Sequence, residues 1–362
     1  MRIVMLSWRG PTHPKRGGAE VYTERVLRPM IERGHSVTWY SATYPGHMPS
    51  SWHGIELKYG LPSLGVYISG LLWIMCHGKE FDVIVDQVNT FGFGTPLTSH
   101  KHKVVCLIHQ LAADVWDAEA RWPFNIVGRA LEKVVLKLYR RTPFMTMSQT
   151  TIDELHEIGW TGTGYVTPTG IDRVYEVEKS AFPSLSFLGR FDAKAKRLEH
   201  AVAAHKKVRE VVSNCELWVI GRGTAPQWLH ALPGVKVYEN IDDHLRDELL
   251  GAAWCCIATS VREGWGRMVT ESGAAGTATV GYNVPGLRDA ILDYRTGVLV
   301  EPNVEKMADV LIYLLTIGKG KLEEYSKEAR EIASRTTWER SSDIFEKAVS
   351  KLVVGHTSPR RA

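Results

Sequence analysis

Residues 254–271 read WCCIATSVREGWGRMVTE. The first five residues form an apolar run with the length and composition of a buried strand. Two glycines, Gly264 and Gly266, follow in a polar loop, and an amphipathic helix is predicted from 267 to 276. A buried strand that leads through a glycine-containing loop into a helix is the repeating unit of a parallel α/β sheet. This stretch therefore predicts an α/β fold.

Short strand patterns and longer helix patterns alternate along almost the whole chain. Strands are predicted at residues 2–7, 36–41, 82–86, 104–108, 144–147, 185–188, 216–220, 236–238, 254–258, 279–281 and 298–300. Helices are predicted at residues 19–33, 64–76, 124–141, 197–212, 243–251, 267–276, 304–316 and 338–352. Such alternation indicates parallel sheets with helices on both faces, and 362 residues suit two domains better than one core. We expect two Rossmann-like, doubly wound domains that face each other across a cleft.

Polar segments without periodicity divide the chain. The predicted N-terminal domain is 1–171, the linker is 172–183 and the C-terminal domain is 184–335. A last helix, within 336–354, is expected to pack back toward the N-terminal domain. Residues 355–362 are expected to form a loose tail.

Composition excludes several classes of protein. A hydrophobic fraction of 44% and a charged fraction of 23% are normal for a globular chain, and a net charge of +4 is too small to indicate nucleic-acid binding. Five cysteines without a C-x-x-C pair argue against structural zinc and redox dithiols. No signal peptide is expected, and the apolar stretch 64–76 is shorter than the roughly 20 residues of a membrane span. We expect that stretch to be a buried helix of a cytoplasmic protein.

The loop after the first predicted strand contains Gly17 and Gly18 at the start of a helix. Paired glycines there allow backbone N–H groups to approach a phosphate, although a tight turn is the simpler interpretation. The G-x-G-x-x-G motif and the acidic residue after the second strand are both absent, which disfavours a dehydrogenase.

Two glutamates flank the glycines of the 254–271 stretch. Glu263 lies in the loop and Glu271 lies about one turn inside the helix, so the two carboxylates can meet different parts of one ligand. The helix N-terminus between them suits a diphosphate. Taken singly, each glutamate could be an ordinary surface residue; with the glycines between them, a ligand site is favoured.

A third loop supplies positive charge. Arg190 follows the predicted strand 185–188, and Lys194, Lys196 and Arg197 come soon after. Cations in a loop of the same domain could neutralise a leaving diphosphate, and a solvated basic loop is the alternative.

Taken together, these segments resemble the family-4 retaining glycosyltransferases, which have the GT-B fold. The resemblance covers nearly the whole chain, and its most specific part is the E-x7-E element from Glu263 to Glu271. The other matching segments are 17–20 (GGAE), 168–172 (PTGID), 187–190 (FLGR) with Lys196, 221–223 (GRG) and 284–289 (VPGLRD). Three positions depart from the family pattern: Thr169 replaces asparagine, Arg197 replaces glycine and Ala278 replaces proline.

The resemblance implies a role for each matching position in the C-terminal domain. Arg190 and Lys196 would grip the donor diphosphate, and Glu263 would lie beside the donor sugar. Glu271 would bind the ribose hydroxyls. The residues whose backbone would contact sugar and phosphates are Gly264, Trp265, Gly266, Arg267, Met268 and Val269.

In the N-terminal domain the resemblance implies that Gly17 and Gly18 face the donor phosphates. His109, which follows the predicted strand 104–108, stands where the family has a histidine near the sugar. A satisfied core histidine is the alternative, and the position at a strand end favours the site.

The implied activity is retaining transfer of a sugar, from a UDP- or GDP-sugar, to a hydroxyl of a glycan, lipid-linked or small-molecule acceptor. The sequence contains no D-x-D segment, so no metal and no other cofactor is expected, and the cations and the helix N-terminus would meet the leaving charge. Glu263 could act as a nucleophile or as a charge stabiliser; a same-face reaction is our preferred version. A GT-B nucleotide-sugar epimerase and a catalytically silent nucleotide-sugar-binding subunit remain as alternatives.

The predicted helix 124–141 is basic and amphipathic. Its cations are Arg129, Lys133, Lys137, Arg140 and Arg141, and its apolar face is Val127, Leu131, Val134, Val135 and Leu138. A solvated polar face on a normally packed helix is the commoner arrangement. The alternative is peripheral contact with an anionic membrane, at the inner face, which would suit a lipid-linked acceptor.

Overall fold

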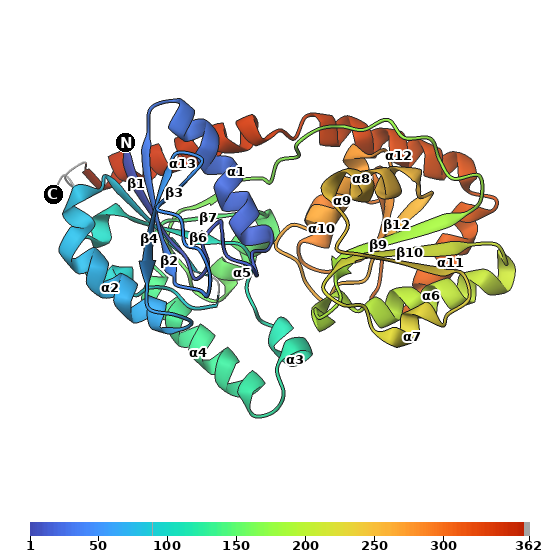
Figure 1. The fold of residues 1–362 in the computed structure, drawn as a ribbon, viewed down its shortest axis with the longest axis horizontal. Coiled ribbons are helices and arrows are strands. Elements are labelled where there is room, and N and C mark those ends of the chain that lie inside the picture. Colours follow the sequence, from blue (N-terminus) through green and yellow to red (C-terminus); the bar gives the residue numbers. More distant parts are fainter. Residues whose placement is uncertain (89, 358–362) are drawn as a thin grey trace. The chain divides into compact units, whose positions relative to one another are not determined.

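A computed structural model describes residues 1–88 and 90–357 of the chain. The chain divides into two compact units. Unit 1 comprises residues 1–113, 126–170 and the segment from 338 onward, and unit 2 comprises 114–125 and 171–337. Figure 1 shows the fold of both, with many of the elements labelled.

Unit 1 contains a parallel sheet with one antiparallel edge strand. Its order over the described residues is β3-β4-β2-β1-β5-β6-β7-β8, and β3 is antiparallel to β4. The strands are β1 (Arg2–Leu6), β2 (Ser36–Ala42), β3 (Ser51–Trp52), β4 (Ile55–Gly60), β5 (Val83–Gln87), β6 (Val104–Ile108), β7 (Phe144–Thr146) and β8 (Gly164–Val166). The helices are α1 (Gly18–Glu32), α2 (Gly65–His77), η1 (Gly78–Glu80), η2 (Thr95–Leu97), η3 (Lys101–Lys103), α4 (Phe124–Tyr139), α5 (Gln149–Glu157) and α13 (Trp338–Thr357).

Unit 2 is a doubly wound sheet in which every described strand pair is parallel. Its order is β11-β10-β9-β12-β13-β14. The strands are β9 (Ser184–Arg190), β10 (Glu216–Arg222), β11 (Val235–Glu239), β12 (Cys255–Ala258), β13 (Thr279–Tyr282) and β14 (Gly297–Val300). The helices are α3 (Val115–Glu119), η4 (Lys194–Lys196), α6 (Leu198–Val211), α7 (Gln227–His230), α8 (Asp243–Ala252), α9 (Arg267–Ala274), α10 (Leu287–Ala290), α11 (Val304–Leu315) and α12 (Lys319–Ser334).

The two sheets confirm the predicted Rossmann-like architecture. Every strand predicted from the sequence is present within one or two residues. The strands that the prediction missed are the short edge elements β3 and β8 and the neighbouring β4. In each unit the strand order reverses at one point, between β1 and β5 in unit 1 and between β9 and β12 in unit 2. Loops at such a switch point leave a crevice at the carboxyl edge of a sheet, where ligands bind in doubly wound folds.

Both sheets are buried by helices. All four residues of β12 are 0% exposed, and β9 contributes Leu185 and Phe187 to the same core. Burial of a side chain of this size stabilises the fold by about 1.5–3 kcal/mol. In unit 1, α13 packs on α1, and the ring of its first residue, Trp338, lies edge-on to Tyr22 at 6.1 Å. The expected loose tail, 355–362, begins in the last turn of α13, and 358–362 lie outside the described residues.

The expectation that 64–76 forms a buried helix is wrong. In α2, Val66, Gly70 and Ile74 are buried, whereas Ile68 is 66% exposed and Leu72 is 58% exposed. The helix packs on β2 and β4 through one face, so the opposite face is left uncovered although its residues are apolar. The high average hydropathy of 64–76 predicted a buried helix. A helix is buried all round only where other elements pack on each of its faces, and here the strands cover one face. In the described residues no helix is both long enough and apolar enough to cross a membrane.

Helix α4 also packs differently from a normal amphipathic helix. Its buried residues are Gly128, Glu132, Leu136 and Tyr139. Its stripe of Val127, Leu131, Val134 and Leu138, which a normally packed helix would bury, is exposed. Buried hydrogen bonds decide this orientation, because Glu132 accepts from the backbone N–H groups of Ala112 and Ala113 and Tyr139 donates to Asp86.

Candidate functional site

The loops that follow β9 and β12 are joined at the switch point of unit 2. The hydroxyl of Thr259 donates to the carbonyl oxygens of Lys196 and Arg197, at 2.9 and 3.0 Å. The N–H of Val261 donates to the carbonyl of Ala195 at 2.8 Å. Since β9 and β12 are hydrogen-bonded neighbours, residues far apart in the sequence meet at one edge of the sheet.

The closest contact among the predicted site residues is between Lys196 and Glu263. Lys196 Nζ donates to Glu263 Oε1 at 2.5 Å, and Ser260 Oγ donates to the same oxygen at 2.6 Å. The Lys196 and Glu263 side chains are 27% and 16% exposed, so a ligand can reach them. The pair places a cation and a carboxylate side by side, one suited to phosphate and the other to sugar hydroxyls or developing positive charge. Ser260 was not predicted, although it lies three residues before Glu263.

The backbone of Glu263 rests against the loop that follows β13. Its N–H donates to the carbonyl of Pro285 at 3.0 Å. A Cβ on Gly286 would lie 2.1 Å from the Glu263 carbonyl oxygen, and Gly286 has a φ of +80°. A side chain at 286 would therefore be excluded by both space and conformation. The segment 284–289 thus supports the position of Glu263.

Gly266 caps α9 in the left-handed conformation, with a φ of +80°. Met268 and Val269 are 5% and 6% exposed, so their side chains are part of the core and not of a ligand site. The first N–H groups of a helix lack partners within it and carry a partial positive charge. Trp265 Nε1 donates to the hydroxyl of Thr270 at 2.8 Å and thereby holds the loop that contains Gly264 against the helix.

Glu271 lies in a network of charges at the same end of the sheet. Its Oε1 accepts from Arg267 at 2.8 Å, one helical turn away. Burial opposes the charged form of Arg246 on α8, but the negative charges of Glu271 and Asp247 outweigh it and raise the Arg246 pKa. Burial raises the pKa of Asp247, and hydrogen bonds from Tyr175 and Arg246 oppose that rise. Arg267 thus holds the carboxylate of Glu271, and Arg246 on α8 adds positive charge that Glu271 stabilises.

Arg190 ends β9, and its side chain is 53% exposed. Its Nε pairs with Asp192 at 3.1 Å. The structure thus brings Lys196 and Glu263 into contact, whereas Arg190 is paired with a neighbour in its own loop.

Two departures from the family pattern have physical explanations. Arg197 has a φ of +49°, the left-handed region in which glycine is least strained, so this chain accepts a strained arginine where the family has glycine. The N–H of Ala278 donates to Ser326 Oγ at 3.1 Å, a bond that the proline of the family pattern could not make. Both changes leave the charged groups of the loop in place.

In unit 1, Gly17 caps α1 at the switch point between β1 and β5, and Gly18 begins the helix. The N–H of Gly17 donates to Glu20 Oε2 at 2.6 Å, and the Glu20 side chain is buried. The Glu20 carboxylate therefore already accepts the hydrogen bond that the Gly17 N–H could donate to a ligand. The next N–H groups at this helix end are those of Gly18 and Ala19.

His109 follows β6 at the same edge of the unit 1 sheet. Its Nε2 lies 2.6 Å from Gln87 Nε2, and its ring lies edge-on to Tyr22 at 5.5 Å. Burial lowers the pKa of His109 to about 4, so the ring is neutral near pH 7. The Gln87 amide therefore holds the orientation of the His109 ring through Nε2. Gln87 was missed, although it directly follows the predicted strand 82–86.

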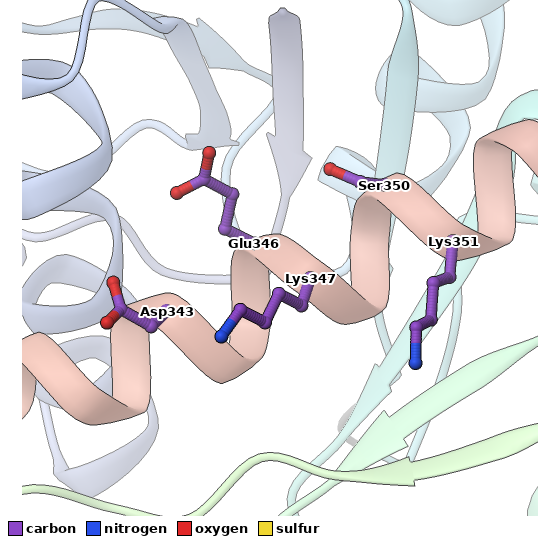
Figure 2. A pocket seen from close by; sticks show the side chains of 5 residues that line it. All are labelled: Asp343, Glu346, Lys347, Ser350 and Lys351. Atoms are coloured by element: carbon purple, nitrogen blue, oxygen red, sulfur yellow. The ribbon is translucent and has the colours of Figure 1, made fainter.

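A surface hollow of unit 1 lies along α13 (Figure 2), and no predicted site residue is among those that line it. It is lined by Asp343, Glu346, Lys347, Ser350 and Lys351. Arg33 pairs with Asp343 at 2.6 Å and with Glu346 at 2.9 Å, and His35 bonds to Glu346 at 2.8 Å. The acidic groups of this hollow thus stabilise the packing of α13.

Comparison with known proteins agrees with the geometry. The model of the family described as Glycosyltransferase Family 4 matches residues 16–174, and the model described as Glycosyl transferases group 1 matches residues 182–317. A phosphatidyl-myo-inositol mannosyltransferase of Propionibacterium freudenreichii is 34% identical over 112 residues, which are 31% of this chain and 28% of that protein. A glycogen synthase of Mycobacterium tuberculosis is 26% identical over 347 residues, which cover 83% of each chain.

Solved structures share the fold over nearly the full length. Sucrose-phosphate synthase from Thermosynechococcus elongatus has a TM-score of 0.78 at 16% identity, covering 98% of this chain and 99% of the other. Anabaena Alr3699/HepE, solved in complex with UDP-glucose, has a TM-score of 0.70 at 16% identity, covering 98% and 100%. The two family matches span both units and meet the predicted motifs in order. The chain therefore belongs to family 4 of the glycosyltransferases and is a glycosyltransferase with the GT-B fold.

Proposed function

We propose that this enzyme transfers a sugar from a nucleotide diphosphate sugar, a UDP- or GDP-sugar, to an acceptor hydroxyl with retention of the anomeric configuration. The observation that carries the proposal is the contact between Lys196 and Glu263 at the switch point of unit 2. A lysine and a carboxylate in contact suit a ligand that carries both phosphate and sugar. The UDP-glucose bound by HepE, a protein with the same fold, supports this class of donor.

In this proposal unit 2 binds the donor. Lys196 and the first N–H groups of α9 meet the diphosphate, and Arg190 turns from Asp192 toward it when the donor binds. Glu271 accepts hydrogen bonds from the ribose while Arg267 keeps its carboxylate in place. These groups would offset the charge of the leaving nucleotide, so we propose that no metal is required.

Glu263 is proposed to act on the sugar. Its Oε1 is held by Lys196 and Ser260. In the same-face version, the bond from the anomeric carbon to the phosphate oxygen breaks first, and the oxocarbenium-like sugar is stabilised by Glu263. The leaving diphosphate oxygen then takes the proton of the acceptor hydroxyl. The acceptor oxygen forms its bond to the anomeric carbon on the face from which the diphosphate leaves, so the configuration is retained. The roles of His109 and Gly18 stay as the family resemblance implies, whereas the Gly17 amide is already bonded to Glu20 and is left out of the phosphate contact.

Unit 1 is proposed to bind the acceptor. The names of the two matched relatives, a phosphatidyl-myo-inositol mannosyltransferase and a glycogen synthase, support a lipid-linked or a glycan acceptor. The cations of α4 and of the two arginines after it support peripheral contact with an anionic membrane, which favours the lipid-linked class.

Nucleotide release tests the proposal. We expect the enzyme to release UDP or GDP in proportion to glycosylated product, with unchanged rates in EDTA, and the product linkage to keep the anomeric configuration of the donor. Release of an epimerised sugar without a glycosylated acceptor would identify an epimerase. Donor binding without turnover on any lipid, glycan or small-molecule acceptor would identify a binding subunit and would contradict the proposal.

A further inference from the structure

Helix α2 presents an apolar surface to solvent. Its exposed side chains, with the loop that leads into it, repeat at helical spacing: Leu61, Leu64, Ile68, Leu72 and Met75 are each 55–66% exposed. Residues 65–77 contain no Asp, Glu, Lys or Arg. An exposed helix in water normally carries charge on its outer face, so an uncharged apolar stripe of this length indicates a surface that is covered by something less polar than water.

Helix α4 presents a second stripe of the same kind, bordered by cations. Val127, Leu131 and Val134 are 50%, 47% and 64% exposed, and Lys133 and Lys137 lie on the flank of this stripe. Glu132 is the one acidic residue between 126 and 141, and it is buried against the loop at 112–113. The exposed part of α4 therefore combines apolar side chains with positive charge alone.

The turn η2 contacts both helices within unit 1. A Cβ on Gly94 would lie 3.6 Å from Leu71 of α2, and the Gly94 N–H donates to the hydroxyl of Tyr139 on α4 at 2.6 Å. Leu97, at the end of this turn, is 69% exposed. We call Leu61, Leu64, Ile68, Leu72, Met75, Leu97, Val127, Leu131, Val134 and Leu138 the apolar surface of unit 1.

Buried hydrogen bonds hold this surface in place. Asp86, 0% exposed at the end of β5, accepts from Tyr139 at 2.6 Å, from Thr95 Oγ1 at 2.7 Å and from the N–H of Phe93 at 3.2 Å. One side chain thereby holds α4 and the turn before Leu97 to the same strand. The apolar surface is thus part of the folded unit rather than a chance exposure of a loose helix.

We propose that the apolar surface of unit 1 inserts into the interface of an anionic lipid bilayer, with α2 as well as α4 in contact with the lipid. The proposal deepens, and rests on, the membrane contact proposed above for 124–141. Lys133, Lys137 and the arginines at 140 and 141 supply the complementary charge for anionic headgroups. A second copy of the chain would bring two sets of cations together without acidic partners, so the charge pattern favours lipid.

A probe on α2 tests insertion directly. Of the five cysteines Cys76 is exposed, beside Met75 on α2, and the other four are buried. An environment-sensitive fluorophore on Cys76 should shift to the blue with vesicles of phosphatidylglycerol and phosphatidylcholine, and should not shift with phosphatidylcholine alone. Absence of a shift with the anionic vesicles would overturn the proposal.

Paired variants separate the apolar and the charged contributions in a vesicle flotation assay. We expect Ile68→Ser with Leu72→Ser to lower the partition coefficient at least about tenfold. We expect Lys133→Gln with Lys137→Gln to lower it about thirtyfold at low salt, and less as salt increases. Matched controls on unit 2 are Val211→Ser with Ile317→Ser, at positions 62% and 85% exposed, and Lys206→Gln with Lys327→Gln, both exposed. Equal losses in the controls would overturn the proposal.

Two further measurements distinguish membrane insertion from the proposed catalytic function and from dimer formation through the same surface. The Ile68 and Leu72 double variant should keep full nucleotide release with a water-soluble acceptor, so vesicle binding and catalysis can fail independently. Circular dichroism of the variant should match the parent. A wild-type dimer that this variant dissociates, without any vesicle binding, would show that a second copy covers the surface and that the lipid proposal is wrong.

Discussion

Lys196 and Glu263 are 67 positions apart in the chain, yet their side chains meet at 2.5 Å above the neighbouring strands β9 and β12. The contact is made by the doubly wound topology, which brings the loops after the first and fourth strands of unit 2 together. Four predictions follow from this arrangement and from its counterpart in unit 1.

Lys196→Ala should lower kcat/KM for transfer about 10²–10³-fold, because it removes a preorganised cation from the leaving diphosphate. Lys206→Ala, an exposed lysine on α6 of the same unit, should change it less than about twofold. Steady-state nucleotide release measures both. Equal rates in the two variants would contradict the diphosphate role.

Glu271→Ala should weaken donor binding about tenfold or more, because it removes charged hydrogen bonds to the ribose and releases Arg267. Glu263→Ala should mainly lower kcat, since its carboxylate is proposed to act on the sugar as the bond breaks. Isothermal titration with the donor and with free nucleotide separates the two. Unchanged donor affinity in Glu271→Ala would rule out the ribose assignment.

Gly286→Ala should destabilise unit 2 by about 2 kcal/mol or more, because its Cβ would lie 2.1 Å from the Glu263 carbonyl at a φ of +80°. Gly320→Ala is the matched control: nothing lies within 4 Å of its Cβ, and it is in α12. Higher helix propensity should make that change stabilising, by about 0.5–1 kcal/mol. Urea unfolding measures the change in the free energy of unfolding, which should be negative for Gly286→Ala and positive for Gly320→Ala. An unchanged free energy of unfolding in Gly286→Ala would contradict the packing argument.

His109→Gln should flatten the pH dependence of stability in unit 1. The folded-state pKa of His109, about 4, lies below its ordinary value of 6.5, so the unfolded chain binds more protons between these values. The free energy of unfolding therefore falls as the pH falls from about 6.5 to 4, and this contribution is complete above 6.5. Between pH 7 and 5 the parent should lose on the order of 1–2 kcal/mol more than the variant. Urea unfolding of both proteins at pH 7 and pH 5 measures this difference. An equal loss of stability in parent and variant would show that burial does not lower the pKa of His109.

Local patterns were sufficient to predict much of unit 2. The strand, glycine loop and helix of 254–271 are all present, with β12 at Cys255–Ala258 and α9 at Arg267–Ala274. The segment was predictable because each of its signals is local: a buried apolar run, a glycine where φ is positive (Gly266), and a helical stripe. The order of the predicted motifs was also sufficient to indicate the family.

Hydrogen-bond partners across strands could not be read in the same way. Gln87 and His109 are 22 positions apart and meet only because β5 and β6 are neighbouring strands. Ser260 with Glu263 and Gly17 with Glu20 are each three positions apart, but both contacts depend on the exact conformation of the loop. A serine or a glutamine at a strand end carries no signal that distinguishes a site residue from a solvated one.

The sequence by itself determined most of the core strands and longer helices, the doubly wound sheets and the family, because hydrophobic periodicity and backbone conformation are local properties of the chain. Only the tertiary structure decided which faces are buried. The stretch 64–76 looked like a core helix, and the apolar stripe of α4 looked like its packed face, yet both are exposed. The physical reason is that an apolar face is buried only where the fold places another element against it. In α4, the buried hydrogen bonds of Tyr139 to Asp86 and of Glu132 to the backbone of Ala112 orient the helix so that its apolar stripe faces solvent.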